Sequence, residues 1–119
     1  MMQRTFAYVC APTTHSADYT PSKLKDYCKA LYDLGFLPVC PSLMFSRFLS
    51  NSIPEQREDK RAMSLALLRR CRVVVVCSDE VTEDMEAEIM LAKRLGIVAT
   101  TLAGIRKISL HTEKGDETE

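Results

Sequence analysis

The sequence has no tryptophan, only four glycines and no surplus of either charge. Its 16 basic residues balance its 16 acidic ones, so the protein has no overall field that would draw it to nucleic acid or to an anionic membrane surface. It also has no uninterrupted apolar run of about 18 residues, the length that a membrane-spanning helix needs. We therefore expect neither nucleic acid nor a membrane among its partners.

Fingerprints of common cofactors and of secretion are missing as well. The sequence contains no Gly-x-Gly-x-x-Gly run and no P-loop, which removes the usual dinucleotide and nucleoside triphosphate motifs, and we expect no cofactor. Its five cysteines are odd in number and none forms a Cys-x-x-Cys pair, and because the sequence begins directly with a mixed segment we expect no signal peptide. This pattern predicts reduced thiols and a cytoplasmic protein.

The chain of 119 residues is long enough for one domain with a core and too short for two ordinary ones. The apolar pattern predicts strands at 5–10, 36–40, 73–76 and 97–101, a weaker fifth at 107–110, and helices at 21–34, 54–70 and 82–95. This alternation predicts an α/β three-layer sandwich, with a four- to five-stranded, mainly parallel sheet between helices on both faces, as in flavodoxin and Rossmann folds. We expect one domain over residues 1–112 and a charged, disordered tail over 113–119.

Local signals support several of these elements. Thr20 and Pro21 are typical of a helix N-cap and first helical residue, and Gly35 is typical of a helix end. The run from Val73 to Val76 predicts a central strand that is buried on both faces. Pro38 has no N–H to give to a strand ladder, which favours a position near an edge of the sheet or a strand end.

Two segments between these elements are harder to interpret. Residues 42–51 are expected to be irregular, and their five large apolar side chains must cover the core, a pocket or a neighbouring subunit. The helix that begins at Pro54 is almost wholly charged over residues 55–61. That half either projects beyond the sheet, over the site or towards a partner, or forms a solvated face with paired charges.

The helix over residues 82–95 carries one carboxylate on its apolar side. Helical residues advance by about 100° each, which places Glu88 in the middle of an apolar arc. The other members of that arc are Leu91, Leu95, Ala92, Met85 and Ile89. Glutamate is rarely buried without a reason, and such a carboxylate suits a nucleophile or a general base. The alternative is a structural Glu88 that is satisfied by Tyr8, an arginine or backbone amides, with Tyr8 itself serving only to pack the core.

The carboxyl ends of parallel strands meet at one edge, where open α/β sheets bind their ligands. We predict substrate contacts among the residues at these ends and at the start of the Glu88 helix. These are Ala11, Pro12, Thr13, Pro41, Ser78, Asp79 and Met85. Asp79 has an alternative role as a helix cap. Cys10, Cys40 and Cys77 also end strands, so a thiol or metal site is a minor alternative to their burial as small apolar groups, and we expect no metal.

Four segments together resemble a known family. They are Tyr8-Val9-Cys10-Ala11-Pro12, Pro41-x-Leu43-x-Phe45-x-x-Phe48-Leu49, Pro54-Glu55-x-Arg57-Glu58 and Met85-x-Ala87-Glu88-Ile89-x-Leu91-Ala92-Lys93-x-Leu95-Gly96-Ile97. The chain looks like the small bacterial and phage proteins with a nucleoside 2-deoxyribosyltransferase-like domain, over about residues 5 to 101. It departs from their pattern at Asp84, where a small glycine is common.

The resemblance implies a role for each of two residues. At the Glu88 position the transferases have a nucleophile that attacks the sugar C1′ and releases the base, and at the Tyr8 position they have a tyrosine that orients it. It also implies a nucleoside or nucleotide as substrate and a homo-oligomer whose subunits complete each other's sites. We therefore expect N-glycosidic bond cleavage or transfer, with a catalytically silent nucleotide-binding or interaction module on the same fold as the alternative.

Overall fold

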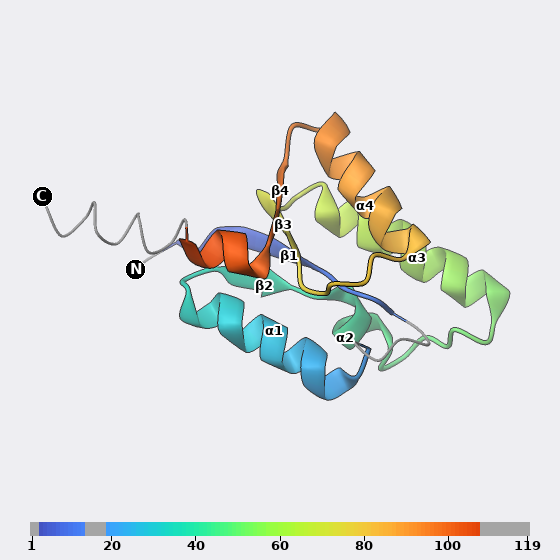
Figure 1. Ribbon diagram of the computed structural model, residues 1–119. Coiled ribbons are helices and arrows are strands. Elements are labelled where there is room, and N and C mark those ends of the chain that lie inside the picture. Colours follow the sequence, from blue (N-terminus) through green and yellow to red (C-terminus); the bar gives the residue numbers. More distant parts are fainter. Residues whose placement is uncertain (1–2, 14–18, 108–119) are drawn as a thin grey trace, which may run out of the picture.

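The computed structural model describes residues 3–13 and 19–107, and its elements alternate between strand and helix (Figure 1). In chain order they are β1 (Phe6–Cys10), α1 (Pro21–Asp33), β2 (Leu37–Val39), α2 (Pro41–Phe45), α3 (Pro54–Leu68), β3 (Val73–Val76), α4 (Glu83–Arg94) and β4 (Val98–Thr101). Residues 102–107 are helical as far as the description extends. In this part of the chain every helix is too short or too polar to span a bilayer.

The four strands form one parallel sheet in the order β2-β1-β3-β4. The valine strand β3 lies between β1 and β4, as its continuous β-branched run predicts. The strand that contains Pro38 is β2, and it lies at an edge, where a missing N–H does no harm. The predicted α/β fold with a parallel sheet is thus confirmed.

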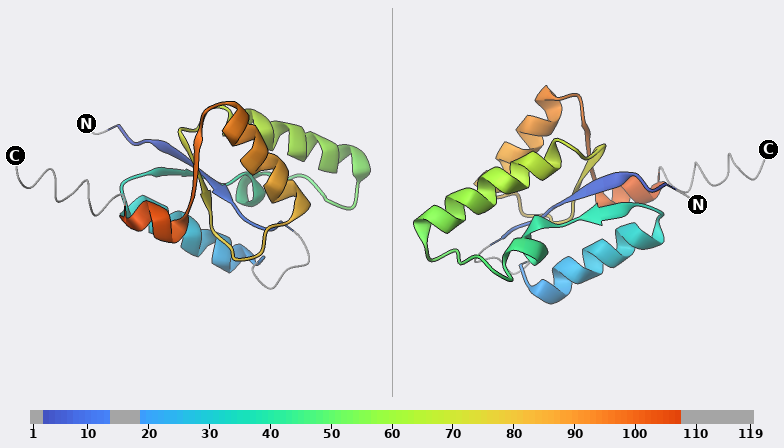
Figure 2. Two further views of the ribbon diagram at one scale, coloured as in Figure 1. Left: turned by 45° about the horizontal axis from the view of Figure 1, so that its top comes forward. Right: turned by 180° about the vertical axis from the view of Figure 1, so that it is seen from behind.

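Helices cover both faces of the sheet, as Figures 1 and 2 show. On one face, Leu24 and Leu31 of α1 pack with Ile105 against alternate residues of β1 and β3. On the other face, Leu68 at the end of α3 and Met85 and Ala92 of α4 pack together. Side chains of a strand alternate between its two faces, so the remaining residues of β1 point towards α3 and α4. Tyr8 and Cys10 belong to that second core.

Side-chain caps fix where α1 and α4 begin. Thr20 accepts a hydrogen bond from the Lys23 N–H at 3.0 Å, and Thr82 accepts one from the Met85 N–H at 3.3 Å. Because Thr82 is the N-cap of α4, the alternative role of Asp79 as its cap is wrong.

Two segments differ from their predicted structure. The segment over 42–51, expected to be irregular, begins within the short helix α2, because Pro41 suits a first helical position and both Pro41 and Phe45 are buried. Lys107 is helical instead of starting a fifth strand, since Leu102 and Ile105, three residues apart, pack on the same core. Residues 108–110 of that expected strand, Thr14 to Asp18 of the first loop and the predicted tail over 113–119 lie outside the described residues.

Candidate active site

One strand holds both carboxylate oxygens of Glu88, which lies in the second turn of α4. The Tyr8 hydroxyl donates a hydrogen bond to Oε2, and the Cys10 thiol donates one to Oε1 at 3.3 Å. The two donors are two residues apart on β1, so they point to the same side of the sheet. The carboxylate therefore has a fixed position and orientation relative to the strand.

Burial and hydrogen bonding act on Glu88 in opposite directions. The pKa of Glu88 is raised to about 7, mainly by burial, while the hydrogen bonds from Tyr8 and Cys10 favour the anion and offset part of that rise. Among the nearby charges that contribute to this value, Asp84 raises the pKa and Arg61 lowers it. Burial and the negative charge of Glu88 raise the pKa of both Tyr8 and Cys10, so both stay protonated as donors. A carboxylate poised near neutral pH suits a nucleophile or a general base.

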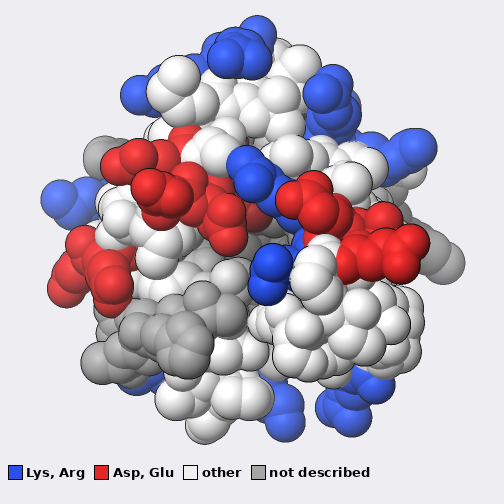
Figure 3. Space-filling model, turned by 90° about the vertical axis from the view of Figure 1, so that its right-hand side faces the viewer, with Lys and Arg blue, Asp and Glu red and all other residues white. Residues whose placement is uncertain are grey.

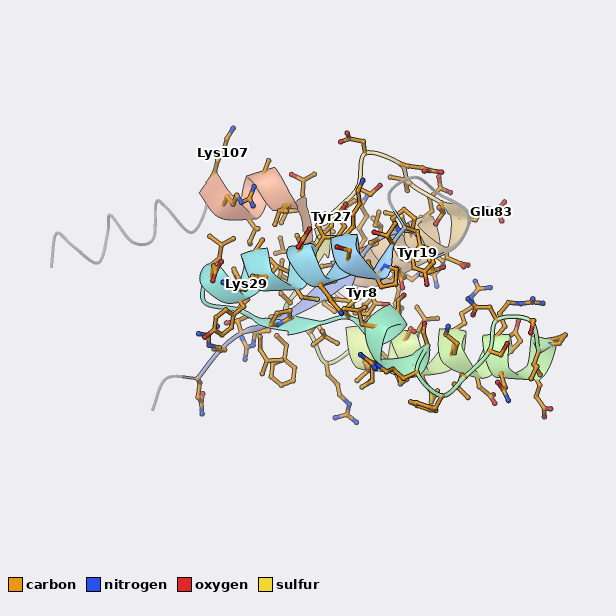
Figure 4. The ribbon with its side chains drawn as sticks, turned by 90° about the horizontal axis from the view of Figure 1, so that it is seen from below. Tyr8, Tyr19, Tyr27, Lys29, Glu83 and Lys107 are labelled. Carbon is orange, nitrogen blue, oxygen red and sulfur yellow. The ribbon has the colours of Figure 1, made fainter. Side chains whose placement is uncertain are left out.

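A pocket of about 240 Å³ opens beside this carboxylate. Its walls come mainly from α3, from the start of α4 and from the segment between α2 and α3. The lining residues are Thr13, Tyr19, Ser42, Ser46, Asn51, Arg57, Glu58, Lys60, Arg61, Ser64, Leu65, Asp84, Ala87 and Glu88. Figure 4 shows Tyr19, which precedes α1, and Glu83, the first residue of α4, on the side of the molecule away from Lys107. Thr13 follows β1, Ser42 follows β2, and Asp84 lies in the first turn of the helix after β3, so the pocket lies at the carboxyl ends of the strands, where parallel sheets bind ligands.

Residues 5–102 match the family described as "Domain of unknown function (DUF7768)". The chain belongs to this family. The match takes in every element from β1 to β4, and with them Tyr8, Cys10 and Glu88. A search of curated proteins finds no match to this DUF7768 domain.

The DUF7768 domain brings some of the predicted site residues together and leaves others apart. Glu88 and Thr13 line the pocket, and Tyr8 reaches Glu88 from the sheet. Four others are buried beside the pocket without lining it: Ala11, Pro12, Pro41 and Met85. Ser78 and Asp79 lie in the loop before α4 and do not line it either. Substrate contact by these six residues stays a prediction.

Two groups of site residues go beyond the predicted set. The sequence predicts Cys10 only as a strand-end thiol, although its spacing of two from Tyr8 places both side chains on one face of β1. On α3, the pocket is lined by Arg57, Arg61 and Ser64, which are four and three residues apart and so share one face of the helix. The two arginines belong to the charged half, so their spacing was a signal in the sequence. The charged half of α3 was expected either to project over the site or a partner or to form a solvated face. Side chains of this half line the pocket, so it lies over the candidate site.

The three strand-end thiols have different hydrogen-bond partners, and that of Cys77 is the Val75 carbonyl. Cys10 turns to Glu88, whereas a hydrogen bond from Cys28, followed by backbone N–H groups of Leu43 and Ser42, lowers the pKa of Cys40. Within residues 3–13 and 19–107, no three histidine, cysteine or acidic side chains are grouped as a metal ion would require.

Proposed function

We propose that this protein cleaves or transfers the N-glycosidic bond of a nucleoside or nucleotide, with Glu88 as the nucleophile. The observation that carries the proposal is the Glu88 carboxylate, which is held at both oxygens by β1 and lines a pocket at the ligand edge of the sheet. The resemblance to nucleoside 2-deoxyribosyltransferases supports it, because that resemblance implies a nucleophile at the Glu88 position and an orienting tyrosine at the Tyr8 position.

In the proposed first step, a Glu88 oxygen forms a bond to the sugar C1′ while the bond from C1′ to the base nitrogen breaks. The base leaves with the bonding electron pair and takes a proton from solvent. Positive charge builds on the sugar ring in the transition state, and the adjacent carboxylate stabilises that charge, as in retaining glycosidases. Tyr8 and Cys10 keep the carboxylate in place for this attack.

In the second step, water or another base attacks C1′ from the opposite side, and the ester bond to Glu88 breaks. The carboxylate recovers its electron pair, and the attacking group loses a proton to solvent. Water gives hydrolysis and a second base gives transfer, so both reactions use the same intermediate.

The volume of the pocket is compatible with a small-molecule substrate. It is about 240 Å³, slightly below the range of about 300–1,000 Å³ that is usual for sites of drug-sized ligands.

Release of free base tests the proposal. Purified protein is incubated with 2′-deoxynucleosides and their 5′-monophosphates, with and without a second base, and free base is quantified by chromatography. We expect release with at least one substrate, and we expect Glu88→Gln to lower its rate by roughly a thousandfold or more, because the nucleophile is lost.

Glu86→Gln is the matched control, since Glu86 is exposed on the same helix and should leave the rate unchanged. Base release that survives Glu88→Gln would exclude Glu88 as the nucleophile. Binding of nucleotide without any base release would instead favour the silent binding module.

A further inference from the structure

Three cations of α3 line the pocket, and none of them forms an ion pair within 4.0 Å with another described residue. They are Arg57, Lys60 and Arg61. Among the described residues, the ion pair within 4.0 Å is Lys29–Asp33, on α1, and no acidic oxygen lies that close to any of the three. Within the described part of the chain, no ion pair at that distance neutralises their charge.

Neutral oxygens hold two of these cations in place. The Lys60 ammonium donates hydrogen bonds to Asn51 Oδ1 at 2.9 Å and to Ser46 Oγ at 3.4 Å, and Arg57 Nη1 donates one to the Asn51 carbonyl at 3.2 Å. Such contacts fix the direction of a side chain and leave its charge uncompensated. Partial burial lowers the pKa of Lys60, as expected for a cation that lacks a counter-ion.

The acidic residues of the pocket restrict where an anion can bind. Asp84 and Glu88 form the α4 wall, and Glu58 also lines the pocket. Arg57 and Lys60 instead meet at Asn51, in the segment between α2 and α3. Figure 3 shows this end of the molecule, where cationic side chains lie between two groups of acidic ones. An anion therefore fits at Arg57 and Lys60, with the remainder of the ligand extending towards Glu88.

We propose that the corner formed by Arg57, Lys60 and Ser46 is a phosphate subsite, and that the substrate is a nucleoside monophosphate whose sugar faces Glu88. A phosphate monoester carries about −1.5 to −2 charges at pH 7, which two cations balance. A free nucleoside would leave both cations without a counter-charge. The assignment of the sugar end rests on the function proposed above, whereas the phosphate end rests on the cations alone.

The test compares each 2′-deoxynucleoside with its own 5′-monophosphate. We expect the wild-type kcat/KM for base release to favour the monophosphate by at least about tenfold, because charge-assisted hydrogen bonds to phosphate strengthen binding to that extent. Arg57→Gln and Lys60→Gln should each reduce this ratio by about tenfold. Arg70→Gln is the charge-matched control, since Arg70 lies beyond the end of α3 and outside the pocket, and it should preserve the ratio.

Binding of the monophosphate is measured by calorimetry in parallel, with inorganic phosphate as a competitor. Equal kcat/KM for the two substrates, unchanged by Arg57→Gln, would overturn the phosphate subsite and leave the glycosidic function standing. Monophosphate binding that inorganic phosphate displaces and Arg57→Gln weakens, without any base release, would support the subsite and contradict the glycosidic function. Absence of both binding and release would overturn both.

Discussion

At the residue scale, the protein keeps a carboxylate in a position where burial and hydrogen bonding nearly balance. Burial alone disfavours the Glu88 anion, and the donors Tyr8 and Cys10 offset part of that cost. The resulting pKa of about 7 makes the anion available at neutral pH. The proposed reaction requires this anion, so its rate should rise with pH through about 7.

The contribution of Cys10 is open to a direct test. Cys10→Ala removes the donor to Glu88 Oε1 at 3.3 Å, so the anion loses support and its pKa rises. We expect the rising limb of the pH–rate profile to move up by about one pH unit, because a hydrogen bond to a charged group is worth about 1.5–3 kcal/mol and a thiol is a weak donor. Cys10→Ser keeps a donor and should move the limb less.

Cys71→Ala is the matched control for this substitution. Cys71 belongs to the same buried core, and its thiol donates to the Leu67 carbonyl instead of to Glu88. Cys71→Ala removes the same volume from the core as Cys10→Ala does, and it should leave the midpoint of the pH–rate profile unchanged. A midpoint that ignores Cys10→Ala, or that moves equally with Cys71→Ala, would show that Cys10 does not support the anion.

At the element scale, α4 is the helix that places Glu88 against β1. Its N-cap is Thr82, its first turn is acidic and its last turn contains Lys93 and Arg94, an order of charges that suits the helix dipole. Gly96 follows the helix with φ 72°, a left-handed conformation that glycine adopts without a steric penalty. These local features fix where the helix begins and ends, and thereby the turn on which Glu88 lies.

The cap of α4 should contribute measurably to stability. Thr82→Ala removes the oxygen that accepts from the Met85 N–H at 3.3 Å. We expect the free energy of unfolding to fall by about 1 kcal/mol, the usual cost of losing an N-cap, and Thr82→Ser to restore most of it. Urea unfolding measures both changes. A loss below about 0.3 kcal/mol would mean that the cap does not anchor this helix.

Elements with their own caps and periodicity were predictable from the sequence, whereas those that depend on tertiary packing were not. Thr20, Gly35 and the valines of β3 identified their elements through local chemistry. The five-residue α2 owes its existence to the burial of Pro41 and Phe45, so no local pattern was long enough to reveal it. The helical residues 102–107 depend in the same way on the packing of Leu102 and Ile105.

At the scale of the whole molecule, strand order explains why the site forms at β1. The chain passes from β1 to β2 on one side and later returns to β3 on the other, so β1 lies where the order of strands reverses. Parallel α/β sheets bind ligands at such topological switch points. Tyr8 and Cys10 of this strand pack in one core with Leu68 of α3 and with Met85 and Ala92 of α4.

The same topology decides how much of the site the sequence could reveal. Glu88 stood out because it interrupts the apolar arc of its own helix, a local feature. The cations Arg57 and Lys60 belong to a helix more than twenty residues earlier, and nothing local indicates that α3 and α4 share one face and one pocket. The loop that carries Ser78 and Asp79 follows a strand end, yet neither side chain lines that pocket. The homo-oligomer that the resemblance implies stays a prediction.

The central claim is that Glu88 forms a covalent bond to the sugar, and intact-mass spectrometry tests it most directly. The protein is mixed with a substrate that releases base, quenched in acid within the first turnover, weighed, and digested to locate the modified peptide. We predict a species heavier by one glycosyl group, carried on the α4 peptide at Glu88 and absent from Glu88→Gln. Base release in wild-type protein without any such species, or with the sugar on another residue, would contradict the claim.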